Sequence, residues 1–297
     1  MRLTIQKKHK ANNGKKWFIV AAVALLSIFS TTLLLQSPNL KKCDISEHDL
    51  VECGCPIDSE LIGKKNIILI DASDKVPGSK FKDIEDLISN FTKPSLTLDW
   101  LHKSKHVDKT SVYVLNANSA VEMLPIASFC QLPPEISVNY FSVLTGKQIN
   151  ELNKSIISAI SMAVSDVAKY TATKTSEIMR TIATTSSNSN EWRDGSNYVV
   201  ISDLYENSQT CSFFDINPVP KFASVSPACK KWAEIIGANM SSEKTTVAIC
   251  RIHSKDMKPG LKDFWDDVFY QATGRKPIYT CDVSKISERT KALELSK

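Results

Sequence analysis

The chain has 297 residues, of which 42% are hydrophobic and 23% charged, the composition of an ordinary globular protein. Its length allows one large domain or two small ones. The formal net charge of +5 overstates the basic character of the chain, because six basic residues and no acidic residue precede Trp17. The remainder has 31 basic and 32 acidic residues, which argues against nucleic acid as a partner.

An uncharged apolar stretch, residues 17–35, follows this basic tail (residues 1–16). A helix of that length spans about 28 Å, close to the hydrocarbon thickness of a bilayer. The positive flank predicts a cytoplasmic amino terminus and places the rest of the chain on the far side. The alternative is a cleaved signal peptide, but the stretch is long for one and no small-x-small cleavage site follows Leu35. We therefore expect a single-pass membrane protein with 17–35 as its retained anchor.

Export explains the cysteine content. The chain has eight cysteines, an even number that could form four disulfides in an oxidising compartment. Eight cysteines allow 105 connectivities, so the pairing stays open. Cys53-Gly-Cys55 could instead begin a zinc site, although it lacks the usual spacer and a second pair. Cys250 lies in an apolar run and can equally be a small buried hydrophobic residue.

Strand and helix patterns alternate over most of the remaining chain. Short apolar, β-prone runs predict strands at 66–71, 111–116, 121–129, 198–202, 245–252 and 277–281. Three- and four-residue periodicity predicts helices at 81–91, 148–170, from 177 onward, 228–240 and 260–273. In the last of these helices Phe264, Trp265, Val268 and Phe269 should face the sheet as core residues. This alternation predicts an α/β fold, a doubly wound, mostly parallel sheet with helices on both faces.

The chain accordingly divides into five segments. These are the basic tail 1–16, the anchor 17–35, a cysteine-containing linker or collar 36–64, one α/β domain 65–283 and a charged tail 284–297. We expect the last segment to be solvated or frayed.

Two of the predicted strands end in acidic and hydroxyl residues. Asp71 and Ser73 follow the strand 66–71, and Asp203 follows the strand 198–202. Ligands of open α/β sheets bind just beyond the carboxyl ends of such strands. Oxygen-only groups suit a hard cation such as Mg²⁺, with Mn²⁺ or Ca²⁺ as alternatives.

The order of elements and these strand ends resemble the von Willebrand factor A (vWA) family. That family has a doubly wound α/β domain with a metal-ion-dependent adhesion site. Its metal motif is Asp-x-Ser-x-Ser after the first strand, a Thr at the start of a helix and an Asp after the fourth strand. Asp71 and Ser73 match the first two positions, whereas Lys75 stands at the third, and Asp203 matches the late Asp.

The middle position of the motif is assigned from spacing. The family's Thr precedes one aliphatic residue by two positions and another by six, and Ser176 has this relation to Ile178 and Ile182. A Ser hydroxyl can replace a Thr hydroxyl, and Thr175 is the neighbouring alternative.

The resemblance therefore implies a divalent cation held by Asp71, Ser73, Ser176 and Asp203. An acidic side chain of a partner protein would complete its coordination. Lys75 opens a different interpretation, in which its ammonium pairs with Asp71 and the chain is a metal-free structural subunit. Asp71 is also similar to the nucleophile of haloacid-dehalogenase-like phosphatases, but their second Asp is replaced here by Ser73. A Mg²⁺-dependent hydrolase using Asp71 and Asp203 is thus an alternative.

We expect no catalysis, and a membrane-anchored, exported vWA-like domain that binds another protein. The basic amino terminus, the anchor and the disulfide-forming cysteines favour the bacterial inner membrane, with the main domain in the periplasm.

Overall fold

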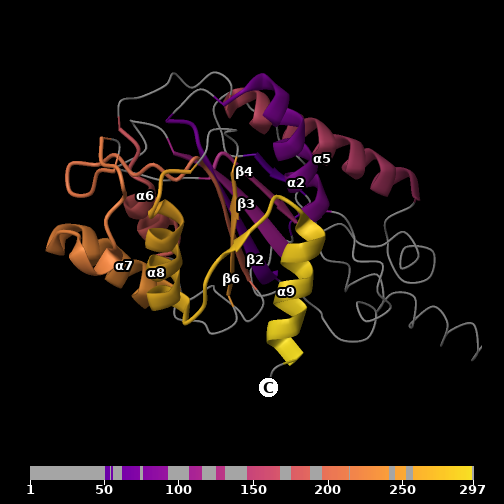
Figure 1. The fold of residues 1–297 in the computed structure, drawn as a ribbon. Coiled ribbons are helices and arrows are strands. Elements are labelled where there is room, and N and C mark those ends of the chain that lie inside the picture. Colours follow the sequence, from indigo (N-terminus) through magenta and orange to yellow (C-terminus); the bar gives the residue numbers. More distant parts are fainter. Residues whose placement is uncertain are drawn as a thin grey trace, which may run out of the picture.

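A seven-stranded, mostly parallel sheet forms the centre of the chain in this computed structural model (Figure 1). The structure describes residues 51–53, 55, 62–73, 76–92, 107–115, 125–130, 146–167, 175–187, 196–213, 215–240, 245–251 and 257–295. The predicted tail 1–16 and anchor 17–35 lie outside these ranges. Within them, no helix is long and apolar enough to cross a membrane.

The strands stand in the order β1-β4-β3-β2-β5-β6-β7. Their bounds are β1 Val51–Cys53, β2 Ile62–Asp71, β3 Val107–Leu115, β4 Ala127–Cys130, β5 Asn197–Ile201, β6 Thr246–Cys250 and β7 Ile278–Tyr279. Every neighbouring pair is parallel except β3 with β4. β2 lies between β3 and β5, so the chain adds strands first on one side of β2 and later on the other.

The central strands are apolar because both faces of the sheet are covered. In β2, Ile68 and Ile70 face one hydrophobic cluster, and Ile67 and Leu69 face a second. All five residues of β5 and of β6 are buried. Continuous apolar runs of this kind are typical of parallel strands buried on both sides. The predicted α/β fold with a mostly parallel sheet is confirmed.

In the described part of the chain, six α-helices cover the two faces (Figure 1). The first face carries α2 Phe81–Thr92, α5 Gly146–Val167 and α9 Val283–Leu295. The second carries α6 Ile178–Thr185, α7 Pro227–Asn239 and α8 Leu261–Thr273. The amphipathic patterns predicted all of these helices except α9.

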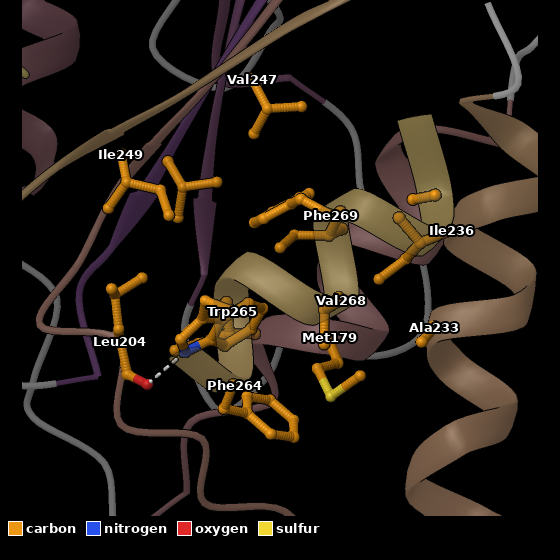
Figure 2. Close-up of a cluster of buried hydrophobic side chains, with 14 of the residues drawn as sticks. Met179, Leu204, Ala233, Ile236, Val247, Ile249, Phe264, Trp265, Val268 and Phe269 are labelled. Carbon is orange, nitrogen blue, oxygen red and sulfur yellow. Dashed lines mark hydrogen bonds between the residues drawn. The ribbon is translucent and has the colours of Figure 1, made fainter. Parts of the chain in front are cut away.

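α8 anchors the second face through aromatic side chains. Phe264, Trp265 and Phe269 are fully buried, as their helical spacing predicts. The rings of Phe264 and Trp265 meet edge to face, with centroids 5.6 Å apart. Figure 2 shows the Trp265 indole N–H donating to the carbonyl oxygen of Leu204, at 3.0 Å. α8 therefore holds the chain segment that follows β5.

The described residues add elements at both borders of the expected domain 65–283. Residues 284–297 were expected to be solvated or frayed, but α9 ends only at Leu295, and Ile286 is fully buried against the first face. The Thr290 hydroxyl lies 2.7 Å from Asn197 Oδ1 and 2.8 Å from Thr246 Oγ1, which ties α9 to two strands. The expected collar also contributes to the sheet, because β1 pairs with β4.

Three disulfides link cysteines of the described part. They are Cys55–Cys130, Cys211–Cys229 and Cys250–Cys281. The expectation of disulfides is confirmed for these six cysteines. Cys55 is therefore not a zinc ligand, and Cys250 is not simply a hydrophobic residue. Each bridge joins segments distant in sequence, so each restricts the unfolded chain.

We expect the paired substitution of Cys250 and Cys281 by Ser to lower the free energy of unfolding by about 3 kcal/mol, because the bridge closes a loop of intermediate length. Chemical denaturation of the oxidised proteins measures this difference. Non-reducing peptide mapping should recover Cys250–Cys281 in the unsubstituted chain. A map in which either cysteine is joined to a different partner would contradict the assignment.

Candidate functional site

The Asp71 carboxylate lies at the carboxyl end of β2. The strands β3 and β5 lie on opposite sides of β2, so this strand end is a topological switch point of the sheet. Ile70 is in register with Ile201, so Asp71 and Ser202 leave neighbouring strands side by side. Asp71 is 4% exposed. Carboxyl ends of parallel strands at such a switch point are the usual ligand sites of open α/β sheets.

Hydroxyl and amide donors from three segments converge on Asp71. The hydroxyls of Ser202 and Ser176 donate to Asp71 Oδ2, at 2.7 and 3.1 Å. The backbone N–H of Ser73 donates to Asp71 Oδ1 at 3.0 Å. A buried carboxylate is stable only with such partners. The structure thus brings together three of the four residues that the sequence selected, Asp71, Ser73 and Ser176.

Ser176, and not Thr175, faces Asp71. Ser176 is buried and Thr175 exposed. Two backbone hydrogen bonds fix Ser176 against the segment that follows β5: its N–H donates to Asn207 O at 3.0 Å, and Asn207 N–H donates to Ser176 O at 2.7 Å. The start of α6 is thereby attached to that segment.

Asp203, the fourth selected residue, is half-buried immediately after Ser202. Its Oδ1 accepts the backbone N–H of Tyr205 at 3.0 Å. It therefore stands at the expected edge of the sheet, with this carboxylate oxygen directed to its own turn. Lys75, on which the metal-free interpretation depends, lies outside the described residues.

Ser202 was missed by sequence analysis. Its hydroxyl accepts the backbone N–H of Leu204 at 2.8 Å in addition to donating to Asp71. Leu204 has φ 73°, a left-handed conformation that is uncommon for a branched residue. The Trp265 hydrogen bond to its carbonyl and its complete burial hold it there. A Ser at the end of an apolar strand gives no separate signal in the sequence.

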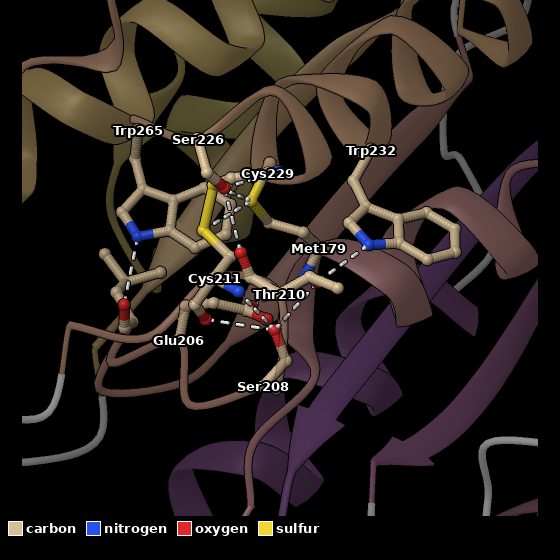
Figure 3. The surroundings of a disulfide bond; sticks show 10 residues. Met179, Glu206, Ser208, Thr210, Cys211, Ser226, Cys229, Trp232 and Trp265 are labelled. Carbon is tan, nitrogen blue, oxygen red and sulfur yellow. Dashed lines mark hydrogen bonds between the residues drawn. A yellow bond between two sulfur atoms is a disulfide. The ribbon is translucent and has the colours of Figure 1, made fainter. Parts of the chain in front are cut away.

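Glu206 is a second residue that sequence analysis missed. Its side chain is fully buried, and its Oε2 accepts the backbone N–H of Met179, in the first turn of α6, at 2.8 Å. Oε1 has no hydrogen-bond partner of acceptable geometry in the described part of the chain. Figure 3 shows Glu206 beside Ser208 and the Cys211–Cys229 disulfide.

Burial raises the pKa of the Glu206 carboxyl from an ordinary value of 4.5 to about 8. The hydrogen bond from the Met179 N–H and the nearby Ser208 hydroxyl lower this pKa, whereas the negative charges of Asp71 and Glu177 raise it further. A raised pKa of this kind is typical of a buried carboxyl with no positive partner, and no Lys or Arg of the described residues forms an ion pair with Glu206.

These donors fit a hard cation in chemical type. The carboxylate of Asp71 and the hydroxyls of Ser73, Ser176 and Ser202 are oxygen groups. The described residues contain no cluster of three or more His, Cys, Asp or Glu side chains that could hold a metal. Any cation here would thus depend on hydroxyls, or on water, as well as on acids.

No protein-family model and no curated protein matches this sequence. Among solved structures, the chain is similar to the human COPII-coat protein Sec24c, with TM-score 0.40 and 10% identity over 78% of this chain and 32% of that one. It is also similar to the TFIIH p34 N-terminal domain, with TM-score 0.35 and 12% identity over 81% and 100% of the two chains. A third similar structure is proximal thread matrix protein 1 from mussel byssus, with TM-score 0.37 and 12% identity over 78% and 47%.

The chain spans about a third of the length of Sec24c. Similarities at these TM-scores carry no inference about function. The α/β sheet with one antiparallel pair is compatible with a vWA-like fold, but the finer family assignment stays a proposal.

Glu206 should make stability depend on pH. Because its pKa is about 8 in the folded chain and near 4.5 otherwise, the folded chain keeps a proton that the unfolded chain loses within that interval. The protonated Glu206 carboxyl stabilises the folded state fully below pH 4.5, and this stabilisation is lost as the pH rises through about 8. We expect Glu206→Gln to flatten the decline in melting temperature across this range, measured by thermal melts at low cation concentration.

Asp83→Asn is the matched control, since Asp83 is an exposed residue of α2 paired with Lys80 at 2.9 Å and does not influence the pKa of Glu206. It should leave the pH dependence close to that of the unsubstituted chain. Equal slopes for the unsubstituted chain and Glu206→Gln would contradict a raised pKa at Glu206.

Proposed function

We propose that this chain is a membrane-anchored, exported vWA-like domain that binds another protein through a divalent cation. The observation that carries the proposal is the Asp71 carboxylate, which is buried between the ends of β2 and β5 and faced by the Ser176 and Ser202 hydroxyls. In this proposal Asp71, Ser73, Ser176 and Asp203 hold Mg²⁺, or Mn²⁺ or Ca²⁺, directly or through water.

The cation would supply an electrophilic position to which an acidic side chain of the partner could bind. The chain's own residues have simpler roles. Asp71 provides negative charge from a fixed strand end, and the serine hydroxyls are held close to it by their attachment to α6 and to the segment after β5. Such a preorganised site binds a cation with little rearrangement.

Several features of the sequence and structure support export and anchoring. The three disulfides are typical of an oxidising compartment. The basic residues before the apolar stretch 17–35 favour a cytoplasmic amino terminus and a periplasmic domain at the bacterial inner membrane.

The first test is a cation titration of the oxidised full-length chain in detergent micelles. We expect Mg²⁺ or Mn²⁺ to raise the melting temperature, because a ligand at a hundred times its Kd stabilises the folded state by about 2.7 kcal/mol. Asp71→Asn, which keeps the shape of the side chain but removes its charge, should abolish the effect. Calorimetry on the same samples measures the affinity.

Asp83→Asn is the control, since Asp83 is an exposed residue of α2 paired with Lys80 at 2.9 Å. It should retain the full cation response. No stabilisation of the unsubstituted chain at millimolar cation would oppose the proposal and favour the metal-free structural subunit. A response equal in Asp71→Asn would place the cation elsewhere.

Partner binding is tested by crosslinking in intact membranes, with and without a chelator. We expect a crosslinked species that requires the cation and is lost in Asp71→Asn. A species that persists in both conditions would argue that the partner binds without the cation.

A further inference from the structure

A pocket of about 590 Å³ opens between the start of α8 and the segment 218–221, which belongs to the connection between β5 and α7. The segment forms an apolar wall with Pro218, Val219 and Pro220, and the exposed side of α8 forms the other wall. None of the lining residues belongs to the site at Asp71. Pockets that bind small molecules usually have volumes of roughly 300–1,000 Å³, so this one is large enough for a ligand.

Close contacts fix the two walls to each other. The Val219 N–H donates to the Pro259 carbonyl oxygen at 2.9 Å, in the turn before α8. Gly260 has φ 87°, and a Cβ there would lie 2.3 Å from the Val219 carbonyl oxygen, so this approach requires glycine. The ring of Phe222 packs against that of Phe264, with centroids 5.7 Å apart. The fold therefore holds both walls in place without a ligand.

Charged side chains of both signs line the pocket. Asp263 and Asp267 are exposed residues one helical turn apart on α8, and Lys221 lies on the opposite wall. None of these three residues forms an ion pair with any residue that the structure describes. Lys276 also lines the pocket, but its ammonium lies 3.5 Å from the buried Asp266 carboxylate, which already balances its charge.

The arrangement of these charges indicates the chemistry of a ligand. Two carboxylates at this helical spacing repel each other. The helix dipole favours an acid in the first turn, which explains Asp263, but Asp267 lies beyond that turn. Two carboxylates and the Lys221 ammonium give a net charge of −1 (−2 + 1). A ligand with two cationic groups and one carboxylate is complementary to this set, and the apolar wall can cover its hydrocarbon chain.

We propose that this pocket binds a basic amino acid, either free or in a dipeptide. The α-ammonium and the side-chain cation of the ligand would lie at Asp263 and Asp267, and its carboxylate would face Lys221. Its methylene groups would contact the prolines of segment 218–221. Binding here does not depend on the cation proposed at Asp71, so either proposal can fail without the other.

A ligand series on the oxidised full-length chain in detergent micelles tests this chemistry. We expect calorimetric titration with L-lysine at low ionic strength to give a Kd of about 1 mM or below. L-norleucine has the same chain without the ε-ammonium, and lysinamide lacks the carboxylate. Each should bind at least about tenfold more weakly than L-lysine, because a hydrogen bond between charged groups is lost. Absence of L-lysine binding, or equal affinities for L-lysine and L-norleucine, would overturn the proposal.

Substitutions locate the bound ligand. Asp263→Asn and Asp267→Asn change exposed side chains and should not disturb folding, which circular dichroism checks. Each should weaken L-lysine binding about tenfold. Lys221→Gln should weaken L-lysine binding but leave the affinity for lysinamide unchanged. Asp215→Asn is the matched control, since Asp215 is an exposed acid just before the segment 218–221 that does not line the pocket. Unchanged affinity in both α8 variants would place the ligand elsewhere and overturn the assignment.

The dipeptide lysyl-alanine separates the two sources of the ligand. It has the same two cationic groups and one carboxylate, with the carboxylate one residue further away. Tighter binding than that of L-lysine would assign the pocket to short peptides, and weaker binding would assign it to the free amino acid. In both cases the binding should be lost in the double variant of Asp263 and Asp267, and binding that persists there would overturn the proposal.

Discussion

The buried carboxylate of Asp71 constrains the segments around it. A charged group at this depth must be met by donors, and the sheet supplies none at the end of a strand. Three segments therefore turn inward to provide them: the residues after β2, the residues before α6 and the end of β5. α6 and β2 are about a hundred residues apart in the sequence. The hydrogen bond from Ser176 to Asp71 and the hydrophobic cluster of the second face together hold them close to each other.

The sequence predicted the parts of this arrangement that depend on repetition. The apolar runs of β2, β5 and β6 are continuous and buried on both faces, so their pattern predicted strands. Asp71 and Ser73 could be selected because they interrupt such a run abruptly, whereas Ser176 was selected because its spacing to Ile178 and Ile182 matches the motif of the family that the sequence resembles. Where the local hydrophobic pattern and the tertiary packing favour the same secondary structure, the sequence pattern alone is enough to predict it.

The failures have equally specific causes. α9 buries Ile286, Thr290 and Leu293 at helical spacing, but its other positions are mostly polar or charged, so the apolar stripe is too narrow to distinguish from a solvated tail. β1 has only three residues and no measurable periodicity. Glu206 and Ser202 acquire their positions from contacts with Met179 and Asp71, which are distant in the sequence. The sequence around Glu206 has the pattern of a turn, and such a pattern does not indicate that the carboxyl is buried with one oxygen hydrogen-bonded.

Contacts other than those of Asp71 also hold the segment after β5. Trp265 fixes the left-handed Leu204 through its carbonyl, Met179 fixes Glu206, and the Cys211–Cys229 bridge joins the segment to the first turn of α7 (Figure 3). Met179 Sδ lies 3.8 Å from Cys211 Sγ and 3.9 Å from Cys229 Sγ, so helix contact and bridge converge on one residue. A strained backbone persists only where its surroundings over-determine it. The Cys211–Cys229 bridge therefore contributes to holding the segment after β5 against the start of α6.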